Sequence, residues 1–382
     1  MRVTLLIDSL GSGGAERSTA LMLPYLRERG VDPSVIVLYA AEGNEDAVRD
    51  AGFDLQVLQS ARLIARVREL RHVIKAERPD ILHTTLFASD QIGRLAAVGT
   101  RTKVVSSLVS TPRRSARTST GIGPAQWKIR VVNAIDIVTS HLFVDRFHAV
   151  SQGVATAFRT KYRLPARNLS VVERGRQATE LGEKSDERRA LVRQELGIDS
   201  SAEVVLAVGR HDYVKAHTDL IRAISQLTAS RPKITLLVAG REGPSTADIK
   251  AEIEAIDGLR NHVRLLGYRA DIADLLAASD VMALPSLLEG TAGVALEAMA
   301  VGTPIVSTRL DGLEGILIDE HNALVVPIGD PPAMAAAIAR LLDDHALATR
   351  LAQAGRKDFL DRFTIERAAD GMVAMYRDVA AS

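Results

Sequence analysis

The sequence predicts an α/β protein with two doubly wound domains, each built on a parallel sheet. Short apolar runs alternate with amphipathic segments along the 382 residues, as strands and helices do in parallel sheets covered on both faces. The alternation pauses over residues 174–190, where the chain is highly charged and lacks apolar periodicity, and then restarts. A chain of this length has room for two domains of ordinary size.

The elements follow in order. In the first half, strands are predicted at 2–8, 34–40, 55–58, 80–85, 103–110 and 147–150, with helices from the glycine loop 11–17 to about residue 29 and over 61–77. In the second half, strands are predicted at 203–210, 233–240, 262–268, 281–286, 303–308 and 323–329, and helices at 216–230, 246–257, 271–278, 292–301 and 332–361. A last helix is predicted at about 365–380, and the charged stretch 174–190 is interpreted as a linker between the domains.

Composition narrows the class of protein. The chain has no cysteine, which excludes disulfides and cysteine zinc sites and is typical of a cytoplasmic protein. The first ten residues are interpreted as a strand and not as a signal peptide, and no apolar run approaches the ~18 residues that span a membrane.

The net charge of +1 hides an asymmetry between the two halves. Residues 1–178 carry 26 basic and 16 acidic residues, whereas the rest of the chain carries 22 and 31. A basic half indicates either an anionic partner, such as a membrane surface or a lipid diphosphate, or a solvated face that balances the acidic half. No nucleic acid is expected as a partner, because the basic region has few aromatic residues.

Residues 286–308 hold the most informative motif. Glu289 falls in a loop and Glu297 inside a predicted short helix, and the residues between them are small: Gly290, Thr291, Ala292, Gly293, Val294 and Ala295, followed by Leu296. Small residues let a ligand approach the backbone, and a helix N-terminus offers N–H groups to an anion. Carboxylates accept hydrogen bonds from sugar hydroxyls. The combination predicts a ligand with an anionic middle and a polyol at each end, such as a nucleotide-sugar.

Two further turns of the second half follow predicted strands. Arg210 and Lys215, in AVGRHDYVKAH, are suited to bind a phosphate, although each is equally a common surface cation. Tyr268 and Arg269 follow Gly267 in a turn against which a base can lie, although Tyr268 is also explained as a half-buried aromatic.

The loop GSGGAER at 11–17 is either a phosphate-approaching loop or a tight strand-to-helix turn. It is not a dinucleotide fingerprint, because Glu16 stands where the third glycine belongs.

His83 lies in a predicted strand where it can face a cleft, whereas His148 is interpreted as structural. The sequence shows no metal-binding spacing, G-x-S-x-G or P-loop, so we expect no metal ion and no cofactor.

Together these motifs resemble the retaining glycosyltransferases of family 4, which have the GT-B fold. The resemblance covers nearly the whole chain. It rests on G-R…K at 209–215, on G-Y-R at 267–269 and on P-S-x-x-E-G…E-A-M-A-x-G-T-P-I-V from Pro285 to Val306, and the segments GGAER, 79–87 and 362–378 are also similar. It implies an acceptor-binding Rossmann-like domain at 1–178 and a nucleotide-sugar-binding one at 179–364, facing a central cleft. The helix 365–382 would cross back onto the first domain.

The resemblance also implies roles. Arg210 and Lys215 would neutralise the donor diphosphate, with Gly209 in the same loop, and Glu289 would contact the donor sugar. Glu297 would accept hydrogen bonds from the ribose. Backbone N–H groups for the sugar and phosphate would come from Thr291, Ala292, Gly293 and Val294. The base would be flanked by Tyr268 and Arg269. From the first domain, Gly13 and Gly14 would approach the diphosphate and the acceptor.

The chain departs from the family pattern in two places. The histidine that many members carry after the strand at 103–110 is absent, and the neighbourhood reads Leu108 to Thr111, with Arg113 beyond, so His83 and Arg113 are the acceptor-side candidates. The strand-end motif before the predicted linker, often N-G-V-D in the family, reads ERGRQ at 173–177 in this chain. Its Arg174 and Arg176 would add positive charge to the cleft.

The resemblance implies sugar transfer, with retention and without a metal, from a UDP- or GDP-sugar to a glycan or lipid-linked acceptor. The expected setting is the cytoplasm, at the inner face of the membrane. The alternatives are a nucleotide-sugar 2-epimerase of the same fold and a non-catalytic nucleotide-sugar-binding partner. Proton exchange at the sugar C2, and donor binding without turnover, would distinguish them.

Overall fold

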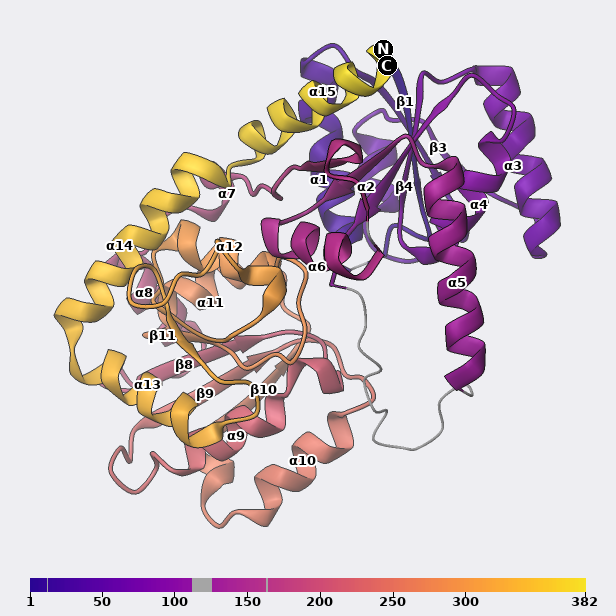
Figure 1. Ribbon diagram of the computed structural model, residues 1–382. Helices are drawn as coiled ribbons and strands as arrows, with labels where there is room; N and C mark the ends of the chain where they lie inside the picture. The colour runs from indigo at the N-terminus through magenta and orange to yellow at the C-terminus, as the bar shows by residue number, and fades with distance from the viewer. Residues whose placement is uncertain (12, 112–125, 163) are drawn as a thin grey trace. The chain divides into compact units, whose positions relative to one another are not determined.

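The computed structural model describes residues 1–11, 13–111, 126–162 and 164–382, in which helices and strands alternate (Figure 1). The chain divides into two compact units. Unit 1 comprises residues 1–175 together with 365–382, and unit 2 comprises residues 176–364. None of the helices in these described residues is long and apolar enough to cross a membrane.

Unit 1 contains a seven-stranded sheet in which every neighbouring pair is parallel, in the order β3-β2-β1-β4-β5-β6-β7. The strands are β1 (Arg2–Ile7), β2 (Asp32–Val37), β3 (Leu55–Val57), β4 (Ile81–Thr85), β5 (Lys103–Leu108), β6 (Arg146–Ala149) and β7 (Leu169–Val171). The helices are α1 (Gly14–Glu28), α2 (Glu45–Asp50), α3 (Leu63–Glu77), α4 (Phe87–Ala97), α5 (Gln126–Phe143), α6 (Gln152–Tyr162) and α15 (Ile365–Ala381).

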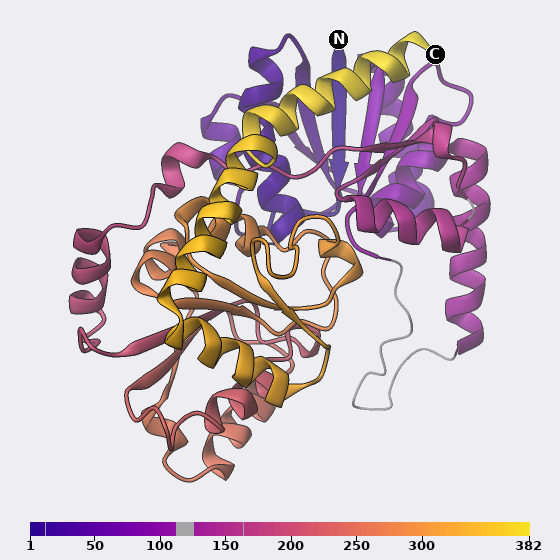
Figure 2. The ribbon, with the colours of Figure 1, turned by 60° about the vertical axis from the view of Figure 1, so that its left-hand side comes forward.

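Helix α15, far along the chain from the rest of unit 1, is packed into the core of that unit (Figure 2). Tyr376 is fully buried there, in a cluster that also contains Leu5 of β1. Gly371 allows close approach, because a Cβ at that position would lie 2.9 Å from Val172 Cγ1. Ion pairs of Arg29 with Asp370 and of Arg146 with Asp378 lie at the helix surface and add little.

Unit 2 contains a six-stranded parallel sheet in the order β10-β9-β8-β11-β12-β13. The strands are β8 (Glu203–Val208), β9 (Ile234–Ala239), β10 (Val263–Gly267), β11 (Val281–Leu284), β12 (Ile305–Thr308) and β13 (Leu324–Val326). The helices are α7 (Ala178–Leu181), α8 (Asp186–Glu195), α9 (His217–Ser225), α10 (Thr246–Ala255), α11 (Ile272–Ala278), α12 (Gly293–Val301), α13 (Pro331–Asp343) and α14 (His345–Arg362).

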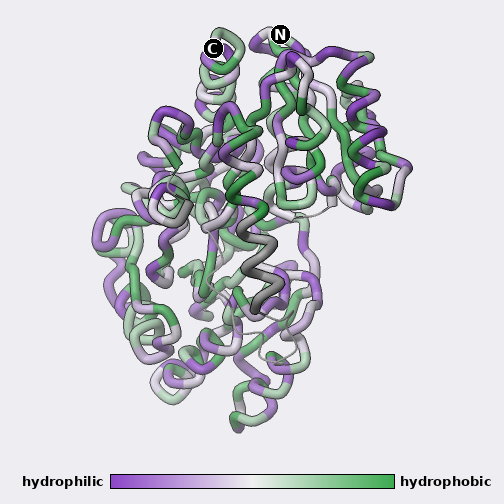
Figure 3. Tube along the Cα trace, turned by 45° about the vertical axis from the view of Figure 1, so that its right-hand side comes forward, coloured by the Kyte–Doolittle hydropathy of each residue, from purple (hydrophilic) through white to green (hydrophobic). Residues whose placement is uncertain are grey.

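The central strands are apolar on both faces, which explains why they form buried parallel sheets. In β8, Val204 and Leu206 join one core cluster, while Val205 and Ala207 join the cluster on the opposite face. Figure 3 shows the hydropathy of each residue along the Cα trace, in which hydrophobic and hydrophilic segments alternate. The predicted fold class, α/β with two doubly wound parallel sheets, is confirmed.

The structure differs from the predicted elements in the following places. The predicted linker 174–190 contains the boundary between the two units, which lies between residues 175 and 176. It also contains α7 and the first turn of α8, which Ser185 caps by accepting a hydrogen bond from the Arg188 N–H. The predicted helix 332–361 is two helices, since Asp344 caps a new one through the Leu347 N–H. Strand β7, which has three residues, was not predicted.

Candidate functional site

The order of the strands in unit 2 reverses between β8 and β11, and this is where ligands bind in open α/β sheets. The carboxyl ends of these two neighbouring strands carry the loops 209–216 and 285–292. The Leu287 N–H donates to the Val214 carbonyl at 2.8 Å and ties the loops together. Sequence motifs that lie some 70 residues apart thus share one edge of the sheet.

Lys215 and Glu289 form the centre of this edge. The Lys215 Nζ donates to Glu289 Oε1 at 2.5 Å, and the Ser286 hydroxyl donates to the same oxygen at 2.7 Å. Gly209 leaves space for the lysine, because a Cβ there would lie 3.2 Å from Lys215 Cδ. The structure therefore brings together the expected phosphate cation and the expected sugar-side carboxylate as an ion pair.

Arg210 lies in the same loop with its side chain well exposed. Its guanidinium forms a 2.5 Å ion pair with Asp212. Burial alone would raise the pKa of Asp212, but the hydrogen bond from Arg210 and the Val214 N–H outweigh it, so that this pKa is lowered. Arg210 thus places a cation at the solvent side of the loop.

Helix α12 starts at the expected backbone donors. Ala292 precedes it in the left-handed region, at φ +43°, a conformation that costs a non-glycine residue roughly 1–2 kcal/mol. The first N–H groups of a helix have no acceptor within it, and the helix dipole makes that end positive. The turn formed by Thr291 to Val294 therefore has the backbone and the charge of an anion site.

Glu297 is deeply buried in α12 and is paired with a residue outside the predicted site. The Arg176 Nε donates to Glu297 Oε1 at 3.0 Å, and each side chain is only 4% exposed. The guanidinium also crowds Gly293, since a Cβ there would lie 2.0 Å from an Arg176 nitrogen. Arg176 is held in place because its N–H donates to the Phe363 carbonyl at 2.9 Å. The sequence offered only the unusual charge of ERGRQ as a signal for this pair.

Tyr268 and Arg269 follow β10, two strands away from β8. The Tyr268 ring is 60% exposed and lies 4.6 Å from the Arg241 guanidinium. Arg269 is turned towards Asp271, to which it donates at 2.7 Å, and this hydrogen bond lowers the pKa of Asp271. Tyr268 is therefore an exposed aromatic residue stacked against a guanidinium, while the charge of Arg269 is largely balanced.

The remaining predicted residues belong to unit 1. Gly13 precedes α1 and Gly14 begins it, and the Gly14 carbonyl accepts a hydrogen bond from Arg174 Nη1 at 3.1 Å. Arg113 lies outside the described residues. His83 is buried in the middle part of β4, with both ring nitrogens in hydrogen bonds.

His83 is part of a hydrogen-bonded chain that crosses the sheet of unit 1. The contacts are Tyr376 Oη to His83 Nδ1 at 2.6 Å, His83 Nε2 to Ser107 Oγ at 2.8 Å, Ser107 Oγ to His148 Nδ1 at 3.0 Å and His148 Nε2 to the Val172 carbonyl at 3.0 Å. Because the Val172 carbonyl can only accept, His148 Nε2 carries a proton, and in a neutral ring His148 Nδ1 then accepts from the Ser107 hydroxyl. By the same argument His83 Nε2 donates to Ser107, and His83 Nδ1 accepts from the Tyr376 hydroxyl. Burial lowers the pKa of His83 well below its usual value and that of His148 to about 4, which keeps both rings neutral.

No group of three His, Cys, Asp or Glu residues that could hold a metal ion occurs in the described parts of the chain.

Comparison with known proteins assigns the two parts of the chain. Residues 12–179 match the family profile Glycosyltransferase Family 4, and residues 188–358 match Glycosyl transferases group 1. The D-inositol 3-phosphate glycosyltransferase of Salinispora arenicola is 30% identical over 318 residues, which are 79% of this chain and 69% of that protein. The lipopolysaccharide core biosynthesis glycosyltransferase LpsE of Rhizobium meliloti is 33% identical over 186 residues, 49% of this chain and about half (53%) of LpsE.

Solved structures share the fold. Anabaena HepE in complex with UDP superposes with a TM-score of 0.84 at 22% identity, over 99% of this chain and 100% of HepE. The sucrose-phosphate synthase of Thermosynechococcus elongatus superposes with a TM-score of 0.84 at 21% identity, over the full length of both chains. These likenesses confirm the expected GT-B fold. The two family profiles and the Salinispora relative together show that the chain belongs to the family 4 glycosyltransferases, with a group 1 glycosyltransferase domain in its second half.

Proposed function

We propose that the protein transfers a sugar from a nucleotide-diphosphate-sugar to an acceptor hydroxyl, with retention of anomeric configuration. The observation that carries this proposal is the Lys215–Glu289 pair at the carboxyl edge of β8 and β11, beside the start of α12. A cation, a carboxylate and a helix N-terminus at one sheet edge match the diphosphate and the hydroxyls of such a donor.

Each group has a chemical role in this proposal. Transfer breaks the bond between the anomeric carbon and the diphosphate oxygen, and forms a bond from that carbon to the acceptor oxygen, whose proton passes to the departing diphosphate. Lys215, Arg210 and the N-terminus of α12 would stabilise the negative charge that develops on the diphosphate, which is usually the largest catalytic contribution. Glu289 would hold the sugar hydroxyls and Glu297 the ribose, so the proposal includes neither a metal ion nor a cofactor.

The relatives guide the choice of substrates. The HepE structures contain UDP and UDP-glucose, so UDP-sugars are the first donors to test, with GDP-sugars second. LpsE acts in lipopolysaccharide core biosynthesis and the Salinispora relative is named for an inositol phosphate. We propose a lipid-linked or cell-surface glycan precursor as the acceptor.

A thermal-shift screen tests the donor proposal. A ligand that binds only the folded protein stabilises it by about 2.7 kcal/mol at one hundred times its Kd. We expect one UDP- or GDP-sugar to raise the Tm by several degrees, and uridine or guanosine, which lack the diphosphate, to raise it far less. The proposal is refuted if no nucleotide-sugar raises the Tm and none is hydrolysed or transferred. The anomer of the product, read by NMR, tests retention.

We also propose that unit 1 binds an anionic membrane surface through α5. Ile135, Val138 and Leu142 are exposed and lie on one face of that helix by their spacing. Val98, Arg101, Lys103 and Leu142 line one hollow, which places cations beside the apolar stripe. Residues 101–176 carry 14 basic residues and three acidic ones, so the charge complements anionic lipid.

Vesicle sedimentation tests this surface. We expect binding to vesicles that contain anionic lipid, weaker binding to neutral ones, and loss of binding as salt rises and shortens the Debye length below about 10 Å. The double change Ile135→Asp and Val138→Asp should weaken binding further, whereas Leu63→Asp, at an exposed position of α3, should not. Binding that is indifferent to lipid charge and to salt would contradict the proposal.

A further inference from the structure

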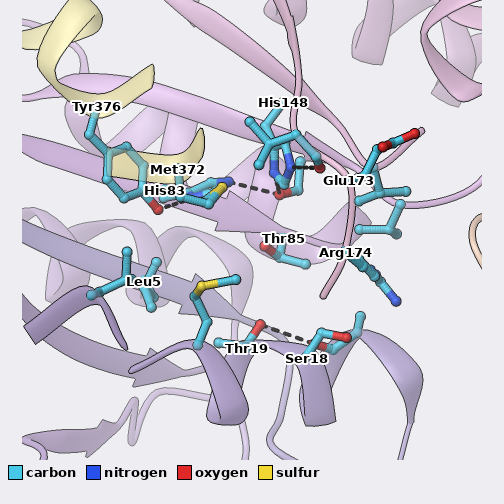
Figure 4. Close-up of a pocket in the computed structure, with 17 residues that line it drawn as sticks. Leu5, Ser18, Thr19, His83, Thr85, His148, Glu173, Arg174, Met372 and Tyr376 are labelled. Atoms are coloured by element: carbon cyan, nitrogen blue, oxygen red, sulfur yellow. Dashed lines mark hydrogen bonds between the residues drawn. The ribbon is translucent and has the colours of Figure 1, made fainter. Parts of the chain in front are cut away.

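Unit 1 contains a pocket of about 70 Å³ between α1, α15 and the sheet (Figure 4). Its floor is the face of the sheet on which Leu5, His83, Ser107 and His148 lie. This volume is several times what one water molecule needs. The pocket extends to the carboxyl ends of the strands, where Thr85, Val109 and Val150 line it, and ligands of open α/β sheets bind at that edge.

Most polar side chains around this pocket form hydrogen bonds within the protein. The Ser18 hydroxyl donates to the Gly14 carbonyl at 2.8 Å, and the Thr19 hydroxyl donates to the Ala15 carbonyl at 3.0 Å. The two histidines, Ser107 and Tyr376 bind one another in the chain that ends at Val172. What remains accessible is mainly carbon, and both imidazoles are neutral, so the interior suits an apolar group and not a sugar or a phosphate.

The pocket is lined by two methionines from different helices. Met22 of α1 and Met372 of α15 both line it. Methionine is unbranched and polarisable, so walls made of it adapt to a flexible chain. The rim, by contrast, is charged: Glu173 and Arg174 follow β7, and Arg174 contacts the carbonyl of Gly14. An apolar interior with a charged rim matches an amphiphile.

We propose that this pocket binds an alkyl or prenyl segment of the acceptor, with the polar head of the acceptor at the Arg174 rim. The inference rests on the proposed transferase function, because it assigns the pocket to the substrate that receives the sugar. It adds a chemical class to that substrate: the acceptor carries a hydrocarbon chain next to its polar part.

Binding of n-alkyl phosphates, from ethyl to octyl and below their micelle concentrations, tests the pocket. Each buried methylene should lower the Kd about fourfold until the pocket is filled, and longer chains should then gain nothing. Calorimetry with the full-length protein gives these constants directly. A Kd that does not depend on chain length would overturn the proposal.

Met22→Trp should fill the pocket and weaken hexyl phosphate binding at least tenfold, without changing the Kd for the donor. Leu63→Trp, which adds the same ring at an exposed position of α3, should leave both constants unchanged. Ser18→Phe, at the half-buried mouth of the pocket, serves as the second variant if Met22→Trp fails to fold. Undiminished hexyl phosphate binding in a folded pocket variant would refute the assignment.

Octyl and methyl glycosides distinguish an acceptor chain from a membrane lipid. If the acceptor chain occupies the pocket, the KM for transfer to the octyl glycoside should be lower, and Met22→Trp should abolish the difference. Equal KM values would overturn the acceptor assignment even where octyl phosphate binds. Donor binding is measured separately, so a protein that binds no nucleotide-sugar refutes the proposed function, whereas donor binding without alkyl binding refutes the pocket alone.

Discussion

Replacing Lys215 with methionine is expected to lower kcat for donor turnover by roughly 10²- to 10³-fold, the usual effect of removing one preorganised donor to a developing negative charge. Methionine keeps the length of the side chain and removes the ammonium that binds Glu289 at 2.5 Å. The matched control is Lys250→Met, which removes a lysine from an exposed pair with Glu242 and should leave kcat unchanged.

The double variant of Lys215→Met and Glu289→Gln sharpens this test. Groups that act as one unit give non-additive losses, so the pair should lose little more than the worse single variant. Initial-rate kinetics for all four proteins give the coupling. A Lys215→Met protein with kcat within a few-fold of the parent would remove this lysine from the reaction.

Replacing Arg176 with methionine is expected to lower the free energy of unfolding by about 3–5 kcal/mol, because it removes the guanidinium that pairs with the buried Glu297 carboxylate. The Glu297 side chain is only 4% exposed, so water can hydrate its carboxylate only poorly. The matched control is Arg222→Met, which breaks an exposed pair with Glu252 and should cost about 0–1 kcal/mol. Urea unfolding at constant pH measures both.

Replacing both members of the pair separates stability from function. Arg176→Met with Glu297→Leu should recover most of the lost stability, because an apolar pair of similar volume often replaces a buried ion pair at little cost. The same double variant should bind the donor more weakly, since no carboxylate remains for the ribose. A single Arg176→Met variant that is no less stable than Arg222→Met would contradict the structural role of the pair.

Much of the candidate site was predictable because it lies in loops that follow strands. Arg210 lies two residues after the end of β8, and Glu289 lies in the loop that follows β11. The carboxyl ends of parallel strands meet at one edge of the sheet. The apolar runs and glycines that identify such strand ends are local, so pattern analysis finds them.

Other contacts depend on how distant parts of the chain meet, which periodicity does not encode. His83 and Tyr376 are 293 residues apart, and Arg176 is 121 residues from Glu297. The errors in α8 and α14 are different, because local signals existed. Ser185 precedes acidic residues, as N-caps do, and Asp344 interrupts an otherwise continuous helical pattern.

The return of α15 to unit 1 has a consequence for biosynthesis. Residues 1–175 leave the ribosome before α15, and at 5–20 residues per second the intervening residues 176–364 take roughly 10–40 s to translate. During that interval Leu5 and Val172 lack the apolar cover that Tyr376 later supplies. The nascent chain therefore exposes the part of the unit 1 core that α15 later covers for the whole time in which unit 2 is made, and chaperones that recognise apolar surface can bind unit 1 in that time.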